Sequence, residues 1–333
     1  MPRASIVIPT WNGADVLRAC LRSLEAQTFS DFETVVVDNG STDGTIAMLA
    51  AEFPRVRQLR LATNLGFAAA TNAGLRAAQG DVLVCLNNDV EAEPGWLEAL
   101  VRVLDARPDI GFVACKMLNA HRPELIDAAG DAMSLLPWNI GRGQPYGPAF
   151  NRPRELLSAC AGAAAYRRQL FERVGYFDEG YFAFFEDVDL GIRAQLAGFR
   201  CWYEPQAVVR HRFSTTAGRA PDLKIFLLVR NGLKLFFQTM PARRVLGWGM
   251  VVLLWPWLDP IFYGRPLRVT ARAWFAFWGR LPEVLRQRRR IYRQRVVPVA
   301  RLLSLLENPW GDMRRAARAL PRRLRALLAG GTA

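Results

Sequence analysis

The sequence lacks the patterns by which several common classes of protein are recognised. Its five cysteines form no CxxC pair, which argues against a structural zinc site and a disulfide framework and favours a reducing compartment. Neither GxGxxG nor GxxxxGK[ST] occurs, so Rossmann-type dinucleotide binding and Walker-type phosphate binding have no support. No long apolar run precedes a cleavage site after Met1, and we therefore expect no signal peptide.

Long apolar segments are also scarce. Residues 245–258 form an apolar run of 14 residues that Pro256 interrupts, whereas a helix that crosses a bilayer needs about 20 apolar residues. The run therefore predicts a re-entrant helix or a helix in the membrane plane. With 333 residues, the chain is long enough for one large domain with an appendage or for two domains.

Positive charge is concentrated in the C-terminal third. Residues 1–220 hold 22 Lys/Arg and 25 Asp/Glu, a balance of −3, and residues 221–333 hold 22 and 5, a balance of +17, which together give the net charge of +14. Nucleic acid and an anionic membrane surface are both possible partners of such a region. Its apolar runs also carry tryptophans, at Trp248, Trp255, Trp257, Trp274 and Trp278. Tryptophan beside arginine is typical of membrane interfaces, so we expect an anionic membrane surface and no nucleic acid.

One segment of this region, residues 286–295, is strongly basic. It is suited to the phosphates of lipid headgroups, and the alternative is a solvated face of a helix.

The first 120 residues alternate between strand and helix patterns. Apolar, Val-rich runs predict strands, and spacing of three to four predicts helices. We expect strands at 5–8, 33–37, 56–61 and 82–86, helices at 15–26, 45–52 and 67–78, and a further helix opened by Pro94. Such alternation indicates an α/β fold with a buried parallel sheet and helices on both faces.

Polar residues follow each of these strands, where ligands bind in sheets of this kind. They are Pro9, Thr10 and Asn12 after the first strand, Asp38 and Asn39 after the second, Asn64 after the third, and Asn87, Asn88 and Asp89 after the fourth. Turn chemistry alone explains any one of them. Four such clusters at one edge of the sheet predict a polar binding crevice.

Three acids follow the aromatic segment 182–185. Glu186, Asp187 and Asp189 lie within four residues, and a cluster of carboxylates next to apolar residues is costly unless a cation, a basic partner or a proton uses the charge. The alternative is the acidic first turn of a helix.

These segments, taken in order, resemble the inverting glycosyltransferases of family 2, and within them the bacterial rhamnosyltransferase-like branch. The resemblance covers about residues 4–235 and rests on residues 5–13, 35–44, 64–67, 86–89, 161–163, 175–179, 185–190 and 209–211. It implies a GT-A-type, Rossmann-like mixed sheet with helices on both faces in residues 1–235. Residues 236–333 would then form a basic, Trp-rich helical region that associates with the membrane.

The resemblance also assigns residues to a nucleotide-sugar donor. It implies that Asp38 binds the base or ribose and that Asp89 and His211 hold Mg²⁺ or Mn²⁺ at the donor diphosphate, although position 87 is Asn where the family often has a second acid. His211 could instead be a surface residue, and Gly162 could serve tight strand packing rather than approach to the sugar. The remaining residues of the expected donor site are Pro9, Thr10, Asn12, Asn39, Asn64, Gly66, Asn87, Asn88 and Gly162.

By the same resemblance, Asp187 would be the general base, with Glu186 and Asp189 on the acceptor side and residues 214–219 as a lid. The implied donor is a nucleotide-diphosphate deoxyhexose such as deoxythymidine-diphospho-rhamnose. The implied acceptor is a saccharide on a polyprenyl diphosphate, in cell-surface polysaccharide synthesis. We expect peripheral or re-entrant attachment to the cytoplasmic face of the plasma membrane. The alternative is a catalytically silent, membrane-docked protein that binds sugar nucleotides.

Overall fold

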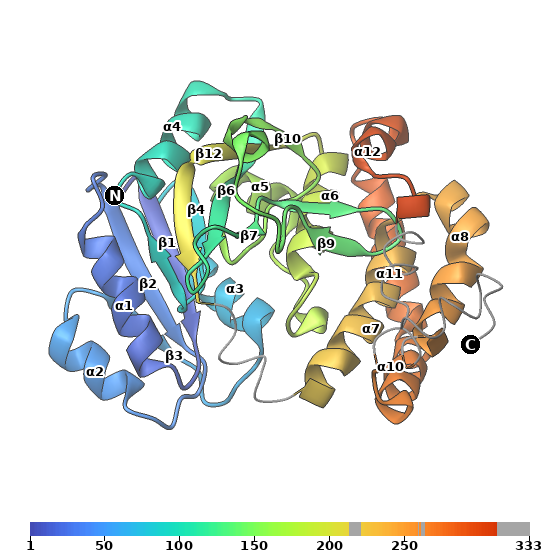
Figure 1. Ribbon diagram of the computed structural model, residues 1–333, viewed down its shortest axis with the longest axis horizontal. Helices are drawn as coiled ribbons and strands as arrows, with labels where there is room; N and C mark the ends of the chain where they lie inside the picture. The colour runs from blue at the N-terminus through green and yellow to red at the C-terminus, as the bar shows by residue number, and fades with distance from the viewer. Residues whose placement is uncertain (213–220, 259, 261–263, 312–333) are drawn as a thin grey trace, which may run out of the picture.

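The computed structural model describes residues 1–212, 221–258, 260 and 264–311. Figure 1 shows a sheet flanked by helices on one side of the molecule and a group of helices on the other. The residues expected to form the lid, 214–219, lie outside the described residues.

The main sheet has the order β10-β12-β6-β11-β4-β1-β2-β3, with β5 pairing with β12 and β7 pairing with β6. Strands β4, β1, β2 and β3 are parallel to one another, and β11 runs antiparallel between β4 and β6. The strands are β1 (Ala4–Thr10), β2 (Phe32–Asp38), β3 (Arg57–Arg60), β4 (Val82–Leu86), β5 (Val90–Ala92), β6 (Ile110–Asn119), β7 (Ile126–Ala128), β10 (Arg154–Leu156), β11 (Ala163–Arg167) and β12 (Arg200–His211), with a separate pair β8 (Asp131–Met133) and β9 (Pro137–Asn139).

Helices cover both faces of this sheet. Alternate strand residues point to opposite faces, so Ile6 and Ile8 pack in one apolar cluster with α1, α2 and α4, while Val7 packs in a second cluster with α3, α5 and α6. These helices are α1 (Ala14–Glu25), α2 (Thr45–Glu52), α3 (Phe67–Ala77), α4 (Trp96–Ala106), α5 (Arg168–Val174) and α6 (Glu186–Leu196), with short 3₁₀ turns η1 (Pro148–Asn151) and η2 (Glu179–Tyr181).

The expected elements of the first 120 residues are present, with small shifts at their ends. The strand at 82–86 and the helix at 45–52 have the predicted limits. The helix expected to open at Pro94 begins at Trp96 instead, because Pro94 lies in the turn before it and the Trp96 N–H bonds the Glu93 carbonyl. The antiparallel strand β11 makes the sheet mixed, as the family resemblance implies, whereas the residue pattern of the first 120 residues indicates only its parallel part.

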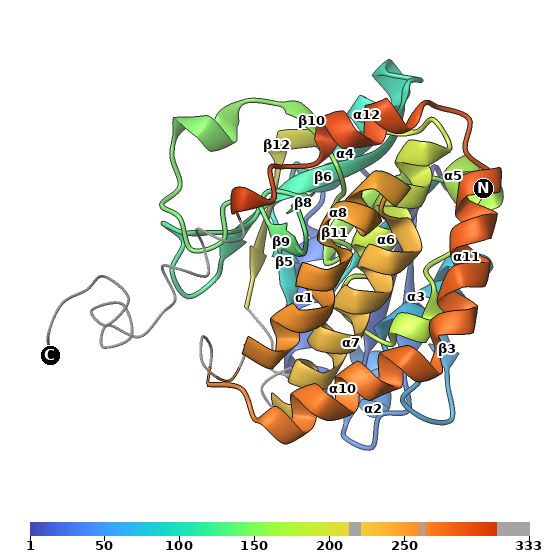
Figure 2. The same cartoon turned by 90° about the vertical axis from the view of Figure 1, so that its right-hand side faces the viewer.

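The C-terminal helices pack around α7 and against α6. Figure 2 shows α8, α10 and α11 beside α7. A third apolar cluster joins these helices to α6 through Val188, Ile192 and Leu196. The bundle comprises α7 (Pro221–Thr239), α8 (Ala242–Leu254), η3 (Trp255–Leu258), α10 (Leu267–Gly279), α11 (Leu281–Arg293) and α12 (Val299–Leu305).

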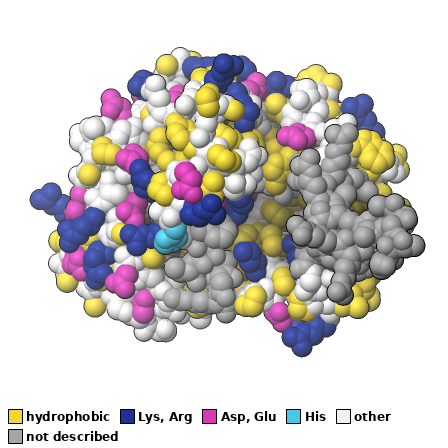
Figure 3. Space-filling view, in the orientation of Figure 1, with side chains coloured by type: hydrophobic (Ala, Val, Ile, Leu, Met, Phe, Trp, Pro, Cys, Tyr) yellow, Lys and Arg dark blue, Asp and Glu magenta, His cyan; other side chains and the backbone are white. Residues whose placement is uncertain are grey.

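The domain division expected at residue 235 falls inside α7, which continues without a break to Thr239. That division stays a prediction. Within the described part of the chain, no helix has both the length and the hydropathy that a membrane crossing requires. On the face in Figure 3, acidic and basic side chains are interspersed over the sheet side of the molecule, in keeping with the near-neutral balance of residues 1–220.

The tryptophans of the bundle mostly pack among themselves. Trp274 donates its Nε1–H to the Leu253 carbonyl at 2.9 Å and meets the ring of Trp257 at a centroid distance of 5.6 Å. Trp248 meets Trp310 at 5.5 Å. The exposed apolar residues of α8 are instead Leu246, Met250 and Leu254. Indole rings thus join the helices, although Trp278 and Trp310 are also exposed, and aliphatic side chains form the outer surface of α8.

Candidate functional site

Side-chain hydrogen bonds join the ends of the four parallel strands. The Asn88 amide donates to the Thr10 hydroxyl at 2.9 Å, which links the ends of β4 and β1. The Asn12 carbonyl oxygen accepts from the Thr42 N–H at 2.7 Å, which links β1 to the loop after β2. The carboxyl edge of the sheet therefore holds a connected set of polar loops, as the sequence pattern predicts.

Asn39 connects the loops after β2 and β3. Its Nδ2 donates to the Asn64 side-chain oxygen at 2.9 Å and to the Gly66 carbonyl at 3.2 Å. Gly66 has φ +87°, and a Cβ there would come within 2.5 Å of Phe182. The Asp38 carboxylate accepts from the Ser41 N–H at 3.2 Å and is 4% exposed, so it caps its turn in addition to any other role.

Gly162 lies where β4 and β11 come together. The Asn87 N–H donates to the Gly162 carbonyl at 2.9 Å, and a Cβ on Gly162 would lie 3.2 Å from the Asn87 amide nitrogen. This close approach is tight for any side chain, so the strand-packing role of Gly162 is present whether or not a sugar also binds there.

The pairing of β12 brings His211 to Asp89. The register places His211 opposite Val90, the residue after Asp89. His211 Nε2 lies 3.2 Å from Asp89 Oδ1, and His211 Nδ1 lies 2.6 Å from Asp127 Oδ2. Arg142 Nη2 lies 3.5 Å from the other oxygen of Asp127. All three residues of the Asp89–His211–Asp127 row are buried, so His211 is not a surface residue.

Burial by itself lowers the pKa of His211, but hydrogen bonds with Asp127 and Asp89 outweigh it and raise that pKa to about 9. The imidazole therefore carries a proton at neutral pH between two carboxylates. A divalent cation at Asp89 would take the place of that charge, with Nε2 as ligand and Asp127 holding the Nδ1–H. The carboxylate suits Mn²⁺ and Mg²⁺, and neutral imidazole is a common metal ligand in proteins.

Asp187 lies in the first turn of α6, beside the start of β11. Its Oδ2 accepts from the Ala161 N–H at 3.1 Å, and its Oδ1 accepts from the Val188 N–H at 2.8 Å. Burial raises the pKa of Asp187 above its ordinary value, while these two hydrogen bonds limit the rise. Ala161 adjoins Gly162, whose carbonyl holds Asn87, so Asp187 and the end of β4 are fixed by one short loop.

A second carboxyl group, on Asp131, lies close to Asp187. One potential ligand atom from each of Asp131, Cys160 and Asp187 lies within 4.8 Å of the other two. Burial raises the pKa of the Cys160 thiol well above its ordinary value, and a protonated thiol is a poor metal ligand. Burial, and then the Asp187 charge, also raises the pKa of Asp131 well above its ordinary value. Asp131 and Asp187 are therefore two neighbouring buried acids whose pKa values are both raised, with the Cys160 thiol beside them.

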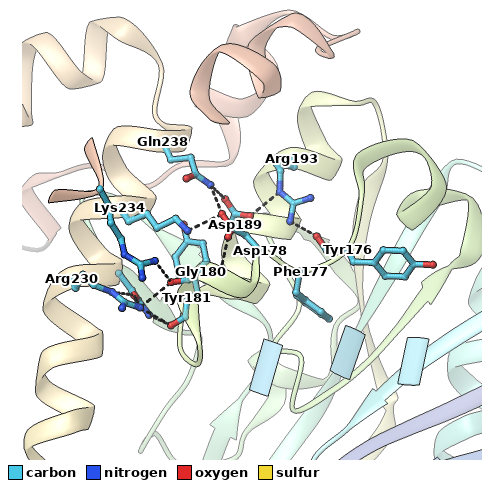
Figure 4. A network of polar contacts seen from close by, with 12 residues as sticks. Tyr176, Phe177, Asp178, Gly180, Tyr181, Asp189, Arg193, Arg230, Lys234 and Gln238 are labelled. Atoms are coloured by element: carbon cyan, nitrogen blue, oxygen red, sulfur yellow. Dashed lines mark hydrogen bonds and ion pairs between the residues drawn. The ribbon is translucent and has the colours of Figure 1, made fainter. Parts of the chain in front are cut away.

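Glu186 and Asp189, the two acids next to Asp187 in α6, are both buried. Asp189 is fully buried, where it accepts from Arg193 Nε at 2.7 Å and Gln238 Nε2 at 2.8 Å. Figure 4 shows this contact among the side chains that join α6 to α7. The acceptor-side role predicted for Asp189 disagrees with this geometry, because the carboxylate is already used in the interior. Glu186 is 5% exposed, and burial followed by the Asp187 charge raises its pKa well above the ordinary value.

The segment before Asp187 has a strained backbone that α7 holds in place. Phe182, Phe184 and Phe185 have backbone φ angles of 67°, 70° and 73°, which residues other than glycine rarely adopt. Asn231 Nδ2 lies 3.0, 2.8 and 2.9 Å from the carbonyl oxygens of residues 181, 183 and 184. Arg230 adds contacts to the carbonyls of residues 180 and 181 (Figure 4). Strain of this kind collects at functional sites.

Sequence reasoning missed Asp127, Asp131, Arg142 and Asn231. A usable signal existed for the two acids, because they lie four residues apart in an otherwise apolar stretch, residues 125–133, and both are buried. Unpaired buried carboxylates are costly, so acids in such a run indicate a site. Asn231 offered no comparable signal.

Comparison with known proteins gives a consistent result. A model of the family described as "Glycosyl transferase family 2" matches residues 5–175. The N-acetylglucosaminyl-diphospho-decaprenol L-rhamnosyltransferase of Mycobacterium tuberculosis is 31% identical over 241 residues, which cover 65% of this chain and 78% of that protein. The PGL/p-HBAD biosynthesis glycosyltransferase of Mycobacterium bovis is 30% identical over 265 residues, covering 77% of this chain and 91% of that protein.

A third relative is much longer than this chain. The O-antigen biosynthesis protein RfbC of Myxococcus xanthus is 31% identical over 240 residues, which cover 68% of this chain but only 19% of that protein. The chain therefore matches a small part of that protein.

Two solved structures share the fold. The mannosyltransferase PcManGT of Pyrobaculum calidifontis, in complex with GDP-Man and Mn²⁺, has a TM-score of 0.52 and 19% identity, covering 91% of this chain and 86% of its own. GalNAc-T7 with UDP, GalNAc and Mn²⁺ has a TM-score of 0.56 and 19% identity, covering 70% of this chain and 47% of its own. At such identity they establish the GT-A-like fold alone.

Proposed function

Because the chain belongs to glycosyl transferase family 2, we propose that it transfers a deoxyhexose such as rhamnose, with inversion, from a nucleotide-diphosphate donor to a hydroxyl of a lipid-linked saccharide. The rhamnosyltransferase relative, named for a decaprenol-diphosphate acceptor, supports this choice of substrates. The single observation that carries the proposal is the Asp187 carboxylate, fixed by the Ala161 N–H on the loop that also fixes the end of β4.

Asp187 is the proposed general base. Its raised pKa brings it closer to neutral pH, where proton transfer to a base is most efficient. It takes the proton of the acceptor hydroxyl as that oxygen bonds to the anomeric carbon. The bond from this carbon to the donor diphosphate breaks at the same time on the opposite face, which inverts the configuration. The neighbouring Asp131, whose pKa is raised well above its ordinary value by burial and then by the Asp187 charge, is proposed to hold a proton while Asp187 carries the charge.

The donor nucleotide would lie over the loops after β1, β2 and β3. Asp38 would accept from the base or ribose, while Asn12, Asn39 and Asn64 keep these loops in place through the hydrogen bonds described above. The other proposed lining residues are Pro9, Thr10, Gly66, Asn87, Asn88 and Gly162.

Asp89 and His211 would hold a divalent metal ion, Mg²⁺ or Mn²⁺, at the donor diphosphate. When bound, the ion supplies Lewis-acid stabilisation of the charge that develops on the leaving diphosphate. Asp127 positions the imidazole by its 2.6 Å contact with Nδ1, and Arg142 in turn contacts Asp127. We further propose that the enzyme works at the cytoplasmic face of the plasma membrane, where its lipid-linked acceptor lies.

The proposal is tested by transfer to a polyprenyl-diphosphate saccharide in vesicles, with deoxythymidine-, uridine- and guanosine-diphosphate sugars as donors. The anomeric configuration of the product shows whether inversion occurs. Asp187→Asn should lower transfer by roughly 10²–10⁴-fold and leave donor binding nearly intact. Asp131→Asn makes the same change at the neighbouring acid, which in this proposal holds a proton, and should keep most of the transfer.

Two results would count against this assignment. Equal losses in the two variants would show that Asp187 is not the distinct base. Donor binding that raises thermal stability, with no transfer to any lipid-linked acceptor, would favour the alternative of a silent sugar-nucleotide-binding protein.

A further inference from the structure

A basic hollow lies in the C-terminal bundle, between the start of α8, the end of α11 and the start of α12. Its volume is about 620 Å³. No acidic residue is among those that line it, and we call it the arginine pocket. The lining residues are Pro241, Ala242, Arg243, Leu285, Arg288, Arg289, Tyr292, Arg295 and Val299.

Among the residues that the structure describes, only one of the four guanidinium groups of this pocket has polar partners. Arg288 donates to the carbonyl oxygens of Phe237 and Met240 at 3.0 and 2.6 Å, which fixes one wall. Arg243, Arg289 and Arg295 form no hydrogen bond or ion pair with any residue that the structure describes. Several like charges around one hollow repel one another. An anion with several oxygens, such as a phosphate, would relieve that repulsion through paired N–H donors.

The apolar surface next to the pocket favours a phospholipid over a free phosphate or a nucleotide. Ala242 lines the pocket, and Leu246, Met250 and Leu254 continue from it along α8 at intervals of four residues. Their side chains are 87%, 65% and 56% exposed. Residues at this spacing share one face of a helix, so an apolar row begins at the pocket. A free phosphate or nucleotide would leave this row in water, whereas a phospholipid offers both a phosphate and acyl chains.

The arginine pocket is also separate from the proposed reaction site. Arg295 precedes Val296, whose N–H donates to the carbonyl of Leu196 at the end of α6. Asp187 lies in the first turn of the same helix. Nine residues of α-helix span about 14 Å, so a phosphate in the pocket is held away from the carboxylate that would receive the proton.

We propose that the arginine pocket binds the phosphate of an anionic membrane phospholipid while the apolar row of α8 enters the bilayer surface. This deepens the proposed function, on which it rests, by naming the contact that would hold the enzyme at its lipid-linked acceptor. Amphipathic helices next to basic groups bind membranes in this way.

Flotation of the full-length protein with vesicles tests the proposal. The two compositions are phosphatidylcholine alone and phosphatidylcholine with phosphatidylglycerol at a ratio of 7:3. The pocket variant is R243Q/R289Q/R295Q. The matched control, R286Q/R290Q/R293Q, removes the same charge from exposed positions of α11 outside the pocket.

The wild-type protein should bind the anionic vesicles, and the pocket variant should lose at least about tenfold more affinity than the control, since general attraction to the surface changes equally in both. Equal losses, or unchanged binding by the pocket variant, would overturn the proposal. If inorganic phosphate protects the wild-type protein against heat, and the protein without phosphate binds neither vesicle, the pocket binds a free anion and the lipid proposal is overturned.

The single variant Arg289→Gln keeps the test decisive if the triple variant fails to fold, because this exposed side chain forms no hydrogen bond or ion pair with a residue that the structure describes. It should show a smaller loss in the same direction. Transfer to a water-soluble acceptor analogue is measured in parallel. Transfer without vesicle binding would refute the docking site alone, and vesicle binding without transfer would refute the proposed enzyme alone.

Discussion

Replacing Asn231 should disturb both the stability of the protein and the position of Asp187. The Asn231 Nδ2 carries two hydrogens and lies within 3.0 Å of three carbonyl oxygens in residues 181–184. Asn231→Ala removes both donors. The carbonyl of residue 181 keeps the Arg230 guanidinium and the Ala183 N–H as partners, so the loss falls on the carbonyls of residues 183 and 184. At roughly 1–3 kcal/mol for each of these two unpaired groups, we expect a loss of roughly 2–6 kcal/mol in the free energy of unfolding.

Transfer should fall as well, because the released segment can relax. Three residues with positive φ store about 1–3 kcal/mol each, and relaxation of any of them moves the start of α6. Urea unfolding measures the free energy of unfolding. The rate of sugar transfer is then divided by the concentration of folded protein. We expect donor binding to change less than the rate of transfer, since the donor loops contact β1 to β4.

Asn231→Asp is the matched control for the hydrogen-bond argument. It keeps the size of the side chain and the oxygen that accepts from Arg230 at 3.0 Å, but it has no N–H to give the three carbonyls. It should cost at least as much stability as Asn231→Ala. If Asn231→Asp unfolds at the wild-type urea concentration, the reasoning is refuted.

Two further variants test the metal site and an internal ion pair. Asp127→Asn should raise the Mn²⁺ concentration for half-maximal transfer by about 10–100-fold, because it weakens the partner that orients His211; an unchanged requirement would contradict this role. Burial raises the pKa of Asp178, but the ion pair with Lys234 at 2.8 Å outweighs it and lowers that pKa. The pair therefore stabilises the fold above the unfolded pKa of about 3.9, and its contribution is lost as pH falls through the lower folded value. Lys234→Met should cost roughly 3–5 kcal/mol at pH 7 and less near pH 3, by urea unfolding.

An exposed pair provides the control for the second of these variants. Arg268 and Asp222 are 3.3 Å apart, with side chains 81% and 54% exposed. Arg268→Met should change stability by less than about 1 kcal/mol. A deficit in Lys234→Met that does not shrink in acid would show that packing, rather than charge, is responsible.

The sequence predicted the parallel half of the sheet, its covering helices and the residues at the strand ends. This was possible because apolar spacing and turn residues act over a few neighbours, and because parallel strands must present their carboxyl ends at one edge. The family and the GT-A-like fold are confirmed by the comparisons. The donor, the acceptor and the membrane contact stay proposals.

Pairings between distant segments could be known only from the tertiary structure. The partners of His211 come from residues 89 and 127, and the clamp on the strained segment comes from residue 231 in a later helix. Asp189 has the same local surroundings as Asp187, yet one turns toward α7 and the other toward β11. Helical periodicity places Arg193 one turn after Asp189, and the two form an ion pair within α6. Only the packing of other elements on α6 decides that Gln238 of α7 closes in Asp189 and that the Ala161 N–H holds Asp187.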